Sequence, residues 1–429
     1  MAKLYSNRGI RFIQALQHRA FTWFWAGQTI STLGDGAFTT ALAVVVYQLT
    51  KSSLAMGLIL MAQITPEVIF TLIGGAVADR LPRRTVLLAS DASRALIVLS
   101  IALLGWLNLL HLWHLFAMAI LFGITLSFFH PSYRALTPEL VPKEHFSSAN
   151  ALTELSIQLG NLLGPALGAG LIALAAGSTA AAFAFDGLTF VISVCSLLIM
   201  RSTPPLSQQT PSLAQKRVTL RTGLHHLGKD IREGFHTILA STWLLWSMIV
   251  AAIALMSYKG AISVALPKLV FAIYGSGPWL LAAISAAIAI GAIIGALFVG
   301  EIKLRRRGVI SLLGYVLSGL ALMTFAFPLP HTVIIPFFVL PAAFLVGFGI
   351  NVMQTIWVTL LYELVPPEKL GRVASVDLLG SLGLLPVGYL LAGWLGDRLG
   401  PPTVFLFGGA FMVVVNLIPL LFRDIRQLQ

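Results

Sequence analysis

Twelve long apolar runs, separated by short polar connections, constrain this chain more than any other feature of its sequence. Each run is close to or longer than the roughly 20 residues that a helix needs to cross a bilayer. The strands of an outer-membrane barrel would instead appear as short alternating segments. We therefore expect an all-α membrane protein with twelve transmembrane helices at 21–48, 54–78, 85–107, 112–133, 149–175, 178–200, 243–271, 278–301, 309–328, 334–361, 373–396 and 402–422.

The distribution of charge indicates how the chain is oriented. A net charge of +12 would suggest a nucleic-acid partner in a soluble protein, but only 10% of these residues are charged and 57% are apolar. If the spans alternate in direction, 23 of the 28 Lys and Arg residues fall on the side of the N-terminus. This bias predicts two cytoplasmic termini in a cell membrane, with the lipid bilayer and no nucleic acid as partner.

The longest polar segment, which starts near Pro204 and Pro205, divides the spans six and six. It predicts two pseudo-symmetric six-helix bundles in a monomeric chain. The predicted parts are a cytoplasmic N-terminal segment at 1–20, a first bundle at 21–200, a cytoplasmic linker at 201–242, a second bundle at 243–422 and a cytoplasmic tail at 423–429.

The two halves resemble each other when the sequence is shifted by 224 residues. Copies with an even number of spans share their orientation, which implies parallel repeats with a substrate site between them near mid-depth. The shift aligns Glu139-Leu-Val-Pro142 with Glu363-Leu-Val-Pro366, Gly36 with Gly260, Gly123 with Gly347, Gly164 with Gly388, and Arg83 with Arg307.

The connection after the second span contains a candidate gate made of Gly75, Asp79, Arg80, Arg83 and Arg84. This pattern resembles the loop signature of the major facilitator superfamily, except that Pro82 replaces the usual glycine. A carboxylate such as Asp79 accepts hydrogen bonds from amides at a helix N-terminus. The resemblance implies that Asp79 latches the cytoplasmic gate against helix eleven, while the arginines pair with Asp91, Glu144 or lipid phosphate. The alternative is an ordinary positively charged loop.

The fifth span contains Gly160, Gly164, Pro165 and Gly168, which resemble the GxxxGPxxGG motif of antiporters. Glycines four residues apart share one helix face and permit close backbone contact, and proline removes a backbone hydrogen bond. Together the motifs are similar to those of bacterial drug and siderophore exporters of the proton-antiporter type, including macrolide efflux proteins. The alternative is tight packing with no bearing on the direction of transport.

Three ionisable side chains lie far from the span ends, namely Asp35, Glu67 and Lys259. A charge at the bilayer centre costs about 2.5 to 3.5 kcal/mol, so these groups must face protein or water. We predict that Asp35 and Glu67 bind protons and release them when Lys259, which the shift aligns with Asp35, or a cationic substrate approaches. The alternatives are a static Asp35–Lys259 ion pair and a Glu67 hydrogen bond to a carbonyl freed by Pro66.

Polar residues three positions apart mark one face of spans four and ten, where Ser127 and His130 align with Asn351 and Gln354. We predict that they line the substrate cavity, with Tyr258 adding an aromatic face. The alternatives are hydrogen bonds between helices for the polar residues and packing or lipid contact for the aromatic ring.

Several other charged residues in the spans receive a structural interpretation. Asp91 and Arg94 lie one turn apart and are expected to form a local pair. Glu154, Asp186 and Asp377 lie near span ends and are expected to reach the membrane interface.

These patterns predict a secondary active transporter that exports amphiphilic small molecules, such as drugs or macrolide-like compounds, by proton antiport and alternating access. The alternative is export, uptake or flipping of a metabolite, siderophore or lysolipid, because the fold does not decide the substrate. An enzyme is disfavoured, since the sequence contains no HExxH motif, no paired aspartates for magnesium and no GKS or GKT loop. We expect protons and a small molecule as partners, with no cofactor and no metal.

Overall fold

The computed structural model describes residues 13–78, 80–200, 235–301, 305–327 and 335–426. Within these ranges the regular structure is helical, and twelve segments are long and apolar enough to cross a membrane. The prediction of an all-α membrane protein with twelve spans is confirmed. The orientation of the termini stays a prediction.

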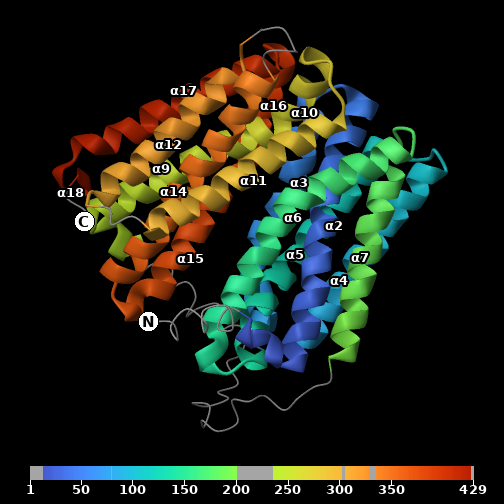
Figure 1. The fold of residues 1–429 in the computed structure, drawn as a ribbon, viewed down its shortest axis with the longest axis horizontal. Helices are drawn as coiled ribbons and strands as arrows, with labels where there is room; N and C mark the ends of the chain where they lie inside the picture. Colours follow the sequence, from blue (N-terminus) through green and yellow to red (C-terminus); the bar gives the residue numbers. More distant parts are fainter. Residues whose placement is uncertain (1–12, 79, 201–234, 302–304, 328–334, 427–429) are drawn as a thin grey trace, which may run out of the picture. The chain divides into compact units, whose positions relative to one another are not determined.

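The first six spans are single long helices (Figure 1). Short polar turns end them, because a backbone that leaves the helical pattern must reach water for its hydrogen bonds. The helices are α2 (Arg19–Thr50), α3 (Ser53–Ala78), α4 (Arg83–Trp106), α5 (Leu112–Leu140), α6 (Phe146–Leu174) and α7 (Ala180–Ile199).

The last six spans are more often interrupted, particularly at prolines. Span seven changes to wider π-helical turns on both sides of Pro267, which lacks the amide that an α-helix needs. The elements are α9 (Thr242–Lys259), η4 (Gly260–Ala265), α10 (Leu266–Lys268), η5 (Leu269–Ile273), α11 (Pro278–Glu301), α12 (Arg307–Thr324), η6 (Ile335–Val339), α14 (Leu340–Leu364), α15 (Pro367–Gly383), α16 (Leu385–Arg398), α17 (Pro401–Leu417), η7 (Ile418–Leu421) and α18 (Arg423–Arg426).

The chain forms two compact units. The first comprises Met1–Leu42 and Thr65–Leu220, and the second comprises Ala43–Ile64 and Arg221–Gln429. The end of α2 and the start of α3 thus pack with the second unit. The predicted division into bundles at 21–200 and 243–422 stays a prediction, and most of the predicted linker lies outside the described residues.

Each unit contains one copy of the same ion pair. In the first unit Arg83, at the start of α4, pairs with Glu139 near the end of α5. In the second unit Arg307, at the start of α12, pairs with Glu363 near the end of α14 at 2.5 Å. The 224-residue shift aligns both partners, so the duplication read from the sequence extends to side-chain contacts.

The glycines of the antiporter-like motif hold α6 against α2. A Cβ at Gly164 would lie 2.6 Å from the Cα of Gly36, and one at Gly168 would lie 2.7 Å from the carbonyl oxygen of Ala37. A Cβ at Gly160 on α6 would collide with Thr32 on α2. Backbone therefore meets backbone along this face, as the glycine spacing predicts.

Pro165 of the same motif is buried on α6, and its carbonyl oxygen is 3.5 Å from the Thr40 hydroxyl on α2. The contact of Gly36 with Gly164 recurs in the second unit, where a Cβ at Gly260 would lie 3.2 Å from the carbonyl oxygen of Gly388.

Gly164→Val should lower the stability of the protein, because the new side chain meets main-chain atoms that cannot rotate away. Overpacking of this kind costs about 1–3 kcal/mol. Gly170→Val is the matched control on the same helix, because a Cβ there meets nothing within 4 Å. Thermal unfolding in detergent measures both variants, and an equal loss in the two would contradict the packing assignment.

Candidate functional site

Asp35 lies halfway along α2, with a glycine on each side. A Cβ at Gly34 would lie 2.5 Å from the Asp186 carboxylate oxygen Oδ1 on α7, and one at Gly36 would lie 2.7 Å from the Gly160 carbonyl oxygen on α6. The absent side chains let two helices approach α2 on either side of Asp35, which is half-buried. The Gly-Asp-Gly sequence thus places a carboxylate where three helices meet in the first unit.

Asp186 is the residue that the sequence interpretation placed wrongly. It lies six residues inside the sixth span and is 0% exposed, so it does not reach the membrane interface. Neither carboxylate oxygen has a hydrogen-bond partner among the described residues. The neighbouring Thr189 hydroxyl donates instead to the Asp186 backbone carbonyl at 2.7 Å.

This environment suits a neutral acid better than an ion. An ionised carboxylate in a medium of low dielectric needs donors or a counter-ion, and the free-energy cost of leaving it bare greatly exceeds that of binding a proton. Asp35 and Arg94 are the charged groups whose electrostatic fields act on Asp186. A single sequence cannot signal this, because nothing in it shows that Asp186 faces Gly34 on another helix.

Asp91 and Arg94 form the local pair that their spacing predicts, but the pair is completely buried. The Asp91 carboxylate also accepts hydrogen bonds from the Gln28 amide at 3.1 Å and the Ser193 hydroxyl at 2.6 Å. Gln28 in turn donates to Ser193 at 2.8 Å. The pair is therefore the centre of a network that ties α4 to α2 and α7.

Aromatic rings enclose the Arg94 guanidinium. Its central carbon lies 4.1 Å from the ring centroid of Phe129 and 4.4 Å from that of Phe190. Cation–π attraction of this kind is worth about 2 kcal/mol or more when water is excluded. The Arg94 guanidinium is therefore held inside the first unit together with its counter-ion, Asp91.

Glu67 and His130 come together within the first unit. The Glu67 carboxylate on α3 lies 3.7 Å from His130 Nε2 on α5, and the two side chains are 13% and 52% exposed. Glu67 follows Pro66 inside the helix, and its own carbonyl accepts the Thr71 hydroxyl at 2.5 Å. A carboxylate beside an imidazole can exchange a proton with it. Proton binding by Glu67 stays a prediction.

The other polar residues predicted to line the cavity, on spans four and ten, differ in exposure and in hydrogen-bond partners. Ser127 is 0% exposed, and its hydroxyl donates to the Ile124 carbonyl of its own helix at 2.6 Å. In the second unit Asn351 is half-buried and accepts the Thr355 hydroxyl at 3.2 Å, whereas Gln354 is exposed. Cavity lining stays a prediction for all of them.

Lys259 and Tyr258 end α9, where span seven changes to π-helical turns. Both residues are half-buried, and the Lys259 ammonium lies 5.7 Å from the centroid of the Tyr258 ring. Widened turns of this kind are often found at functional sites. Asp35 and Lys259 belong to different units, so their predicted coupling stays a prediction.

Two arginines of the predicted gate bind helix ends in the first unit. Arg83 donates to Glu139 and to the Ala135 carbonyl at 2.9 Å, and Arg84 donates to the Leu197 carbonyl at 2.8 Å. Cations are favourable at helix C-termini, where carbonyls lack partners. The partners therefore differ from the expected Asp91 and Glu144.

The remaining members of the predicted gate are Arg80, Asp79 and Gly75. Arg80 is exposed, and Asp79 lies outside the described residues. A Cβ at Gly75 would meet nothing within 4 Å, whereas one at Gly74 would collide with the Ser127 carbonyl oxygen of α5. The close helix contact near this motif is thus made by Gly74.

The second unit contains an apolar cavity of about 320 Å³ between α9, α16 and α17. Phe407 and Phe411 contribute aromatic walls, and Ser257 is the one polar side chain in its lining. Gly260 and Gly388 belong to its lining at the point where the helices approach closely. The cavity offers apolar contact, which suits the hydrophobic part of an amphiphile.

The geometry of twelve spans, repeated ion pairs and buried carboxylates is that of a membrane transporter. The profile of the Major Facilitator Superfamily matches residues 24–384 of the chain. The chain belongs to the Major Facilitator Superfamily. Its resemblance to that superfamily, predicted from the loop motif, is confirmed.

Curated members of this superfamily match nearly the whole chain. The "Uncharacterized MFS-type transporter YfiS" of Bacillus subtilis (strain 168) is 27% identical and covers 94% of this chain and 93% of its own. "Macrolide efflux protein A" of Streptococcus pyogenes is 23% identical, with coverage of 95% and 97%. "Enterobactin exporter EntS" of Escherichia coli O9:H4 (strain HS) is 26% identical, with coverage of 96% and 94%.

Solved structures of the superfamily share the fold. A POT family transporter in complex with 5-aminolevulinic acid superposes with a TM-score of 0.69 at 15% identity, covering 95% of this chain and 96% of its own. A bacterial homologue of the human lysosomal transporter Spinster gives 0.65 at 13% identity, with the same coverage. These identities are too low to transfer a substrate, so the structures inform on architecture alone.

Arg94→Met should destabilise the protein strongly, because it leaves the Asp91 carboxylate buried without its counter-ion. Breaking a buried pair on one side costs about 3–5 kcal/mol. The double variant Asp91→Leu/Arg94→Met removes both charges and should recover much of that loss. Thermal unfolding in detergent compares the two, and a double variant no more stable than Arg94→Met would show that the ion pair is not the source of the loss.

Proposed function

We propose that this Major Facilitator Superfamily protein exports amphiphilic small molecules across the cell membrane in exchange for protons. The observation that carries the proposal is a pair of carboxylates inside the spans, Asp35, which follows Gly34 on α2, and the buried Asp186 of α7, which faces Gly34. Such acids can bind and release protons as their access to water changes. The relatives named as macrolide and enterobactin exporters support an outward direction.

Proton exchange works in this proposal through the fixed charge of Arg94. When Asp35 is ionised, the guanidinium partly balances it, and when Asp35 is protonated Arg94 is balanced by Asp91 alone. A cationic or amphiphilic substrate would then compete with the proton for the same carboxylate. Alternating access moves both ligands in opposite directions, because each conformation offers the site to one side of the membrane.

Siderophore export is the second candidate. This candidate is favoured by an enterobactin exporter that matches the chain over 94% of its own length. Enterobactin and macrolides differ in chemistry, so a transport assay can distinguish them. An assay in sealed inverted vesicles with an imposed pH gradient, run with macrolides, tetracyclines, dyes and siderophores, separates the two. Gradient-independent movement of every compound would overturn the proton-antiport proposal.

Asp35→Asn should abolish the response of transport to the pH gradient, since an amide cannot take up a proton in this range. Glu154→Gln is the matched control, because Glu154 is an exposed carboxylate of the same unit that accepts a hydrogen bond from Gln158. Substrate flux in vesicles at a series of external pH values measures both variants. An unchanged gradient dependence in Asp35→Asn would remove this residue from the mechanism.

Asp186→Asn should change the free energy of unfolding by no more than about 1 kcal/mol, because an amide replaces a neutral acid of the same shape. It should nevertheless shift or flatten the pH profile of transport. Thermal unfolding and vesicle flux test the two parts separately. A loss of about 3–5 kcal/mol would instead indicate that Asp186 is ionised and paired in the native state.

A further inference from the structure

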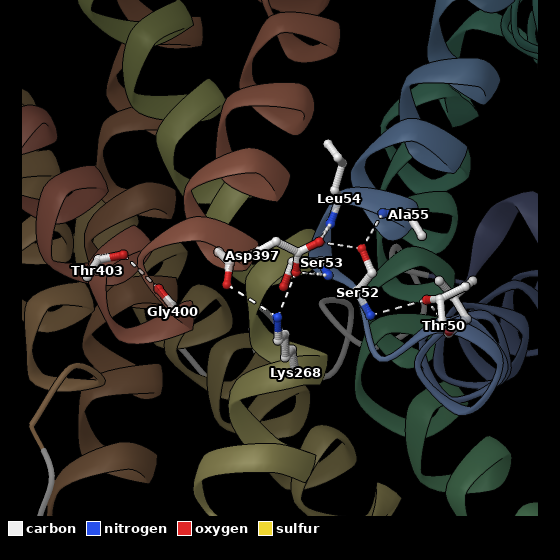
Figure 2. A network of polar contacts seen from close by, with 11 residues as sticks. Thr50, Ser52, Ser53, Leu54, Ala55, Lys268, Asp397, Gly400 and Thr403 are labelled. Atoms are coloured by element: carbon white, nitrogen blue, oxygen red, sulfur yellow. Dashed lines mark hydrogen bonds and ion pairs between the residues drawn. The ribbon is translucent and has the colours of Figure 1, made fainter.

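A carboxylate at the end of α16 binds the start of α3 within the second unit. Asp397 accepts hydrogen bonds from the backbone amides of Ser53 at 2.8 Å and Leu54 at 3.1 Å, and from the hydroxyl of Ser52. The Lys268 ammonium approaches the same carboxylate at 2.7 Å. Figure 2 shows Asp397 between the first turn of α3 on one side and Lys268 on the other. We call these four contacts the Asp397 clamp.

Helix physics explains why the carboxylate binds at this point. The first amides of a helix have no partner within the helix and carry the positive end of its dipole, so they attract an anion. Ser52 already serves as the local cap, because its hydroxyl oxygen accepts the Ala55 amide at 3.1 Å. Asp397 satisfies the amides that this cap leaves free, from a position more than 340 residues later in the sequence.

Glycines bring the two helices close enough for this contact. A Cβ at Gly393 would lie 2.8 Å from the Cα of Leu54, and one at Gly396 would lie 3.0 Å from the Ser53 side chain. On the other helix, a Cβ at Gly57 would collide with the Tyr389 carbonyl oxygen. The clamp is therefore the polar end of a contact in which backbone meets backbone.

The path of the chain places the clamp on the membrane face opposite the two termini. The connection between the first and second spans lies one crossing away from the N-terminus, and the end of α16 lies one crossing away from the C-terminus. Lys268 lies near the end of span seven, about one turn before Ile273, toward that same face. This face contains few of the positive residues, so a lysine there has a specific partner rather than a general role in orientation.

The clamp has no counterpart under the internal repeat. The 224-residue shift aligns Asp397 with Ala173 and Lys268 with Val44, neither of which carries a charge. Ser53 aligns with Gly277, which precedes α11. The acid and the lysine are therefore present in one half only, whereas the Arg83–Glu139 pair has a counterpart in the Arg307–Glu363 pair.

We propose that the Asp397 clamp is a latch that holds spans two and eleven together on the face opposite the termini. The latch rests on the proposed function, since alternating access requires spans two and eleven to separate on that face in one half of the transport cycle. Opening would pull the first turn of α3 from the carboxylate and expose Asp397, Lys268 and the free amides to water. The latch thus sets how often that face opens, without touching the substrate.

Cysteine labelling tests the latch directly. Ser53 is 1% exposed, and its hydroxyl has no hydrogen-bond partner among the described residues, so Ser53→Cys should fit in place. The background is Cys195→Ser, which removes the single native cysteine, an exposed residue. Adding Asp397→Asn should raise the rate of modification by a membrane-impermeant maleimide about tenfold, because charged hydrogen bonds are lost.

Glu363→Gln is the matched control, since it breaks an ion pair of the same unit near the end of α14 without touching α3 or α16. It should leave the labelling rate unchanged. Lys268→Gln, which removes the counter-ion alone, should give an intermediate rate and provides the test if Asp397→Asn does not fold. Parent-like labelling in a folded Asp397→Asn or Lys268→Gln variant would overturn the latch.

The labelling rate also separates this inference from the proposed function. It reports the opening of one face in proteoliposomes with no substrate and no pH gradient. Failure of proton-driven export would therefore leave the labelling result intact. A latch that fails in labelling would equally leave export measurable in the vesicle assay.

Discussion

The backbone contact of α2 with α6 and α7 decides where the charged groups of the first unit lie. Without Cβ atoms at Gly34 and Gly36, both neighbouring helices approach α2 beside Asp35. That approach excludes water from Asp186 and leaves its carboxylate without a donor among the described residues. Small residues, which in membrane helices replace the hydrophobic effect as a means of association, here also create the electrostatic environment of the acids.

Duplication supplied the architecture of the chain, and departures from it supplied the chemistry. The ion pair between spans three and four recurs between spans nine and ten. The glycine contact of Gly36 with Gly164 likewise recurs as that of Gly260 with Gly388. By contrast, the repeat aligns Asp35 with Lys259, and it aligns Asp397 with Ala173, which carries no charge. Two identical halves would carry the same charged groups at matching depths, so the differences in chemistry between the halves reside in these unshared residues.

The spans and the family were predictable because bilayer thickness and the free-energy cost of unpaired backbone groups act on every residue locally. The glycine seam of α6 was predictable for a similar reason, since its spacing is periodic. Asp186 and Asp397 were not, because their roles depend on which residues of a distant helix they meet. Arg83 likewise pairs with Glu139 rather than with Asp91, which is nearer in the sequence. The packing of α4 on α5 determines this partner.

The chemistry of the Asp397 clamp matches the chemistry expected of Asp79 at the other face. Each is a carboxylate at the end of one helix that can bind the free amides at the start of another, and the roles of spans two and eleven are exchanged between them. A helix N-terminus is an economical partner for such a switch, because its amides are equally satisfied by water once the carboxylate leaves. Both conformations then keep their backbone groups solvated or bonded, and the difference in free energy between them stays small enough for protons and substrate to control.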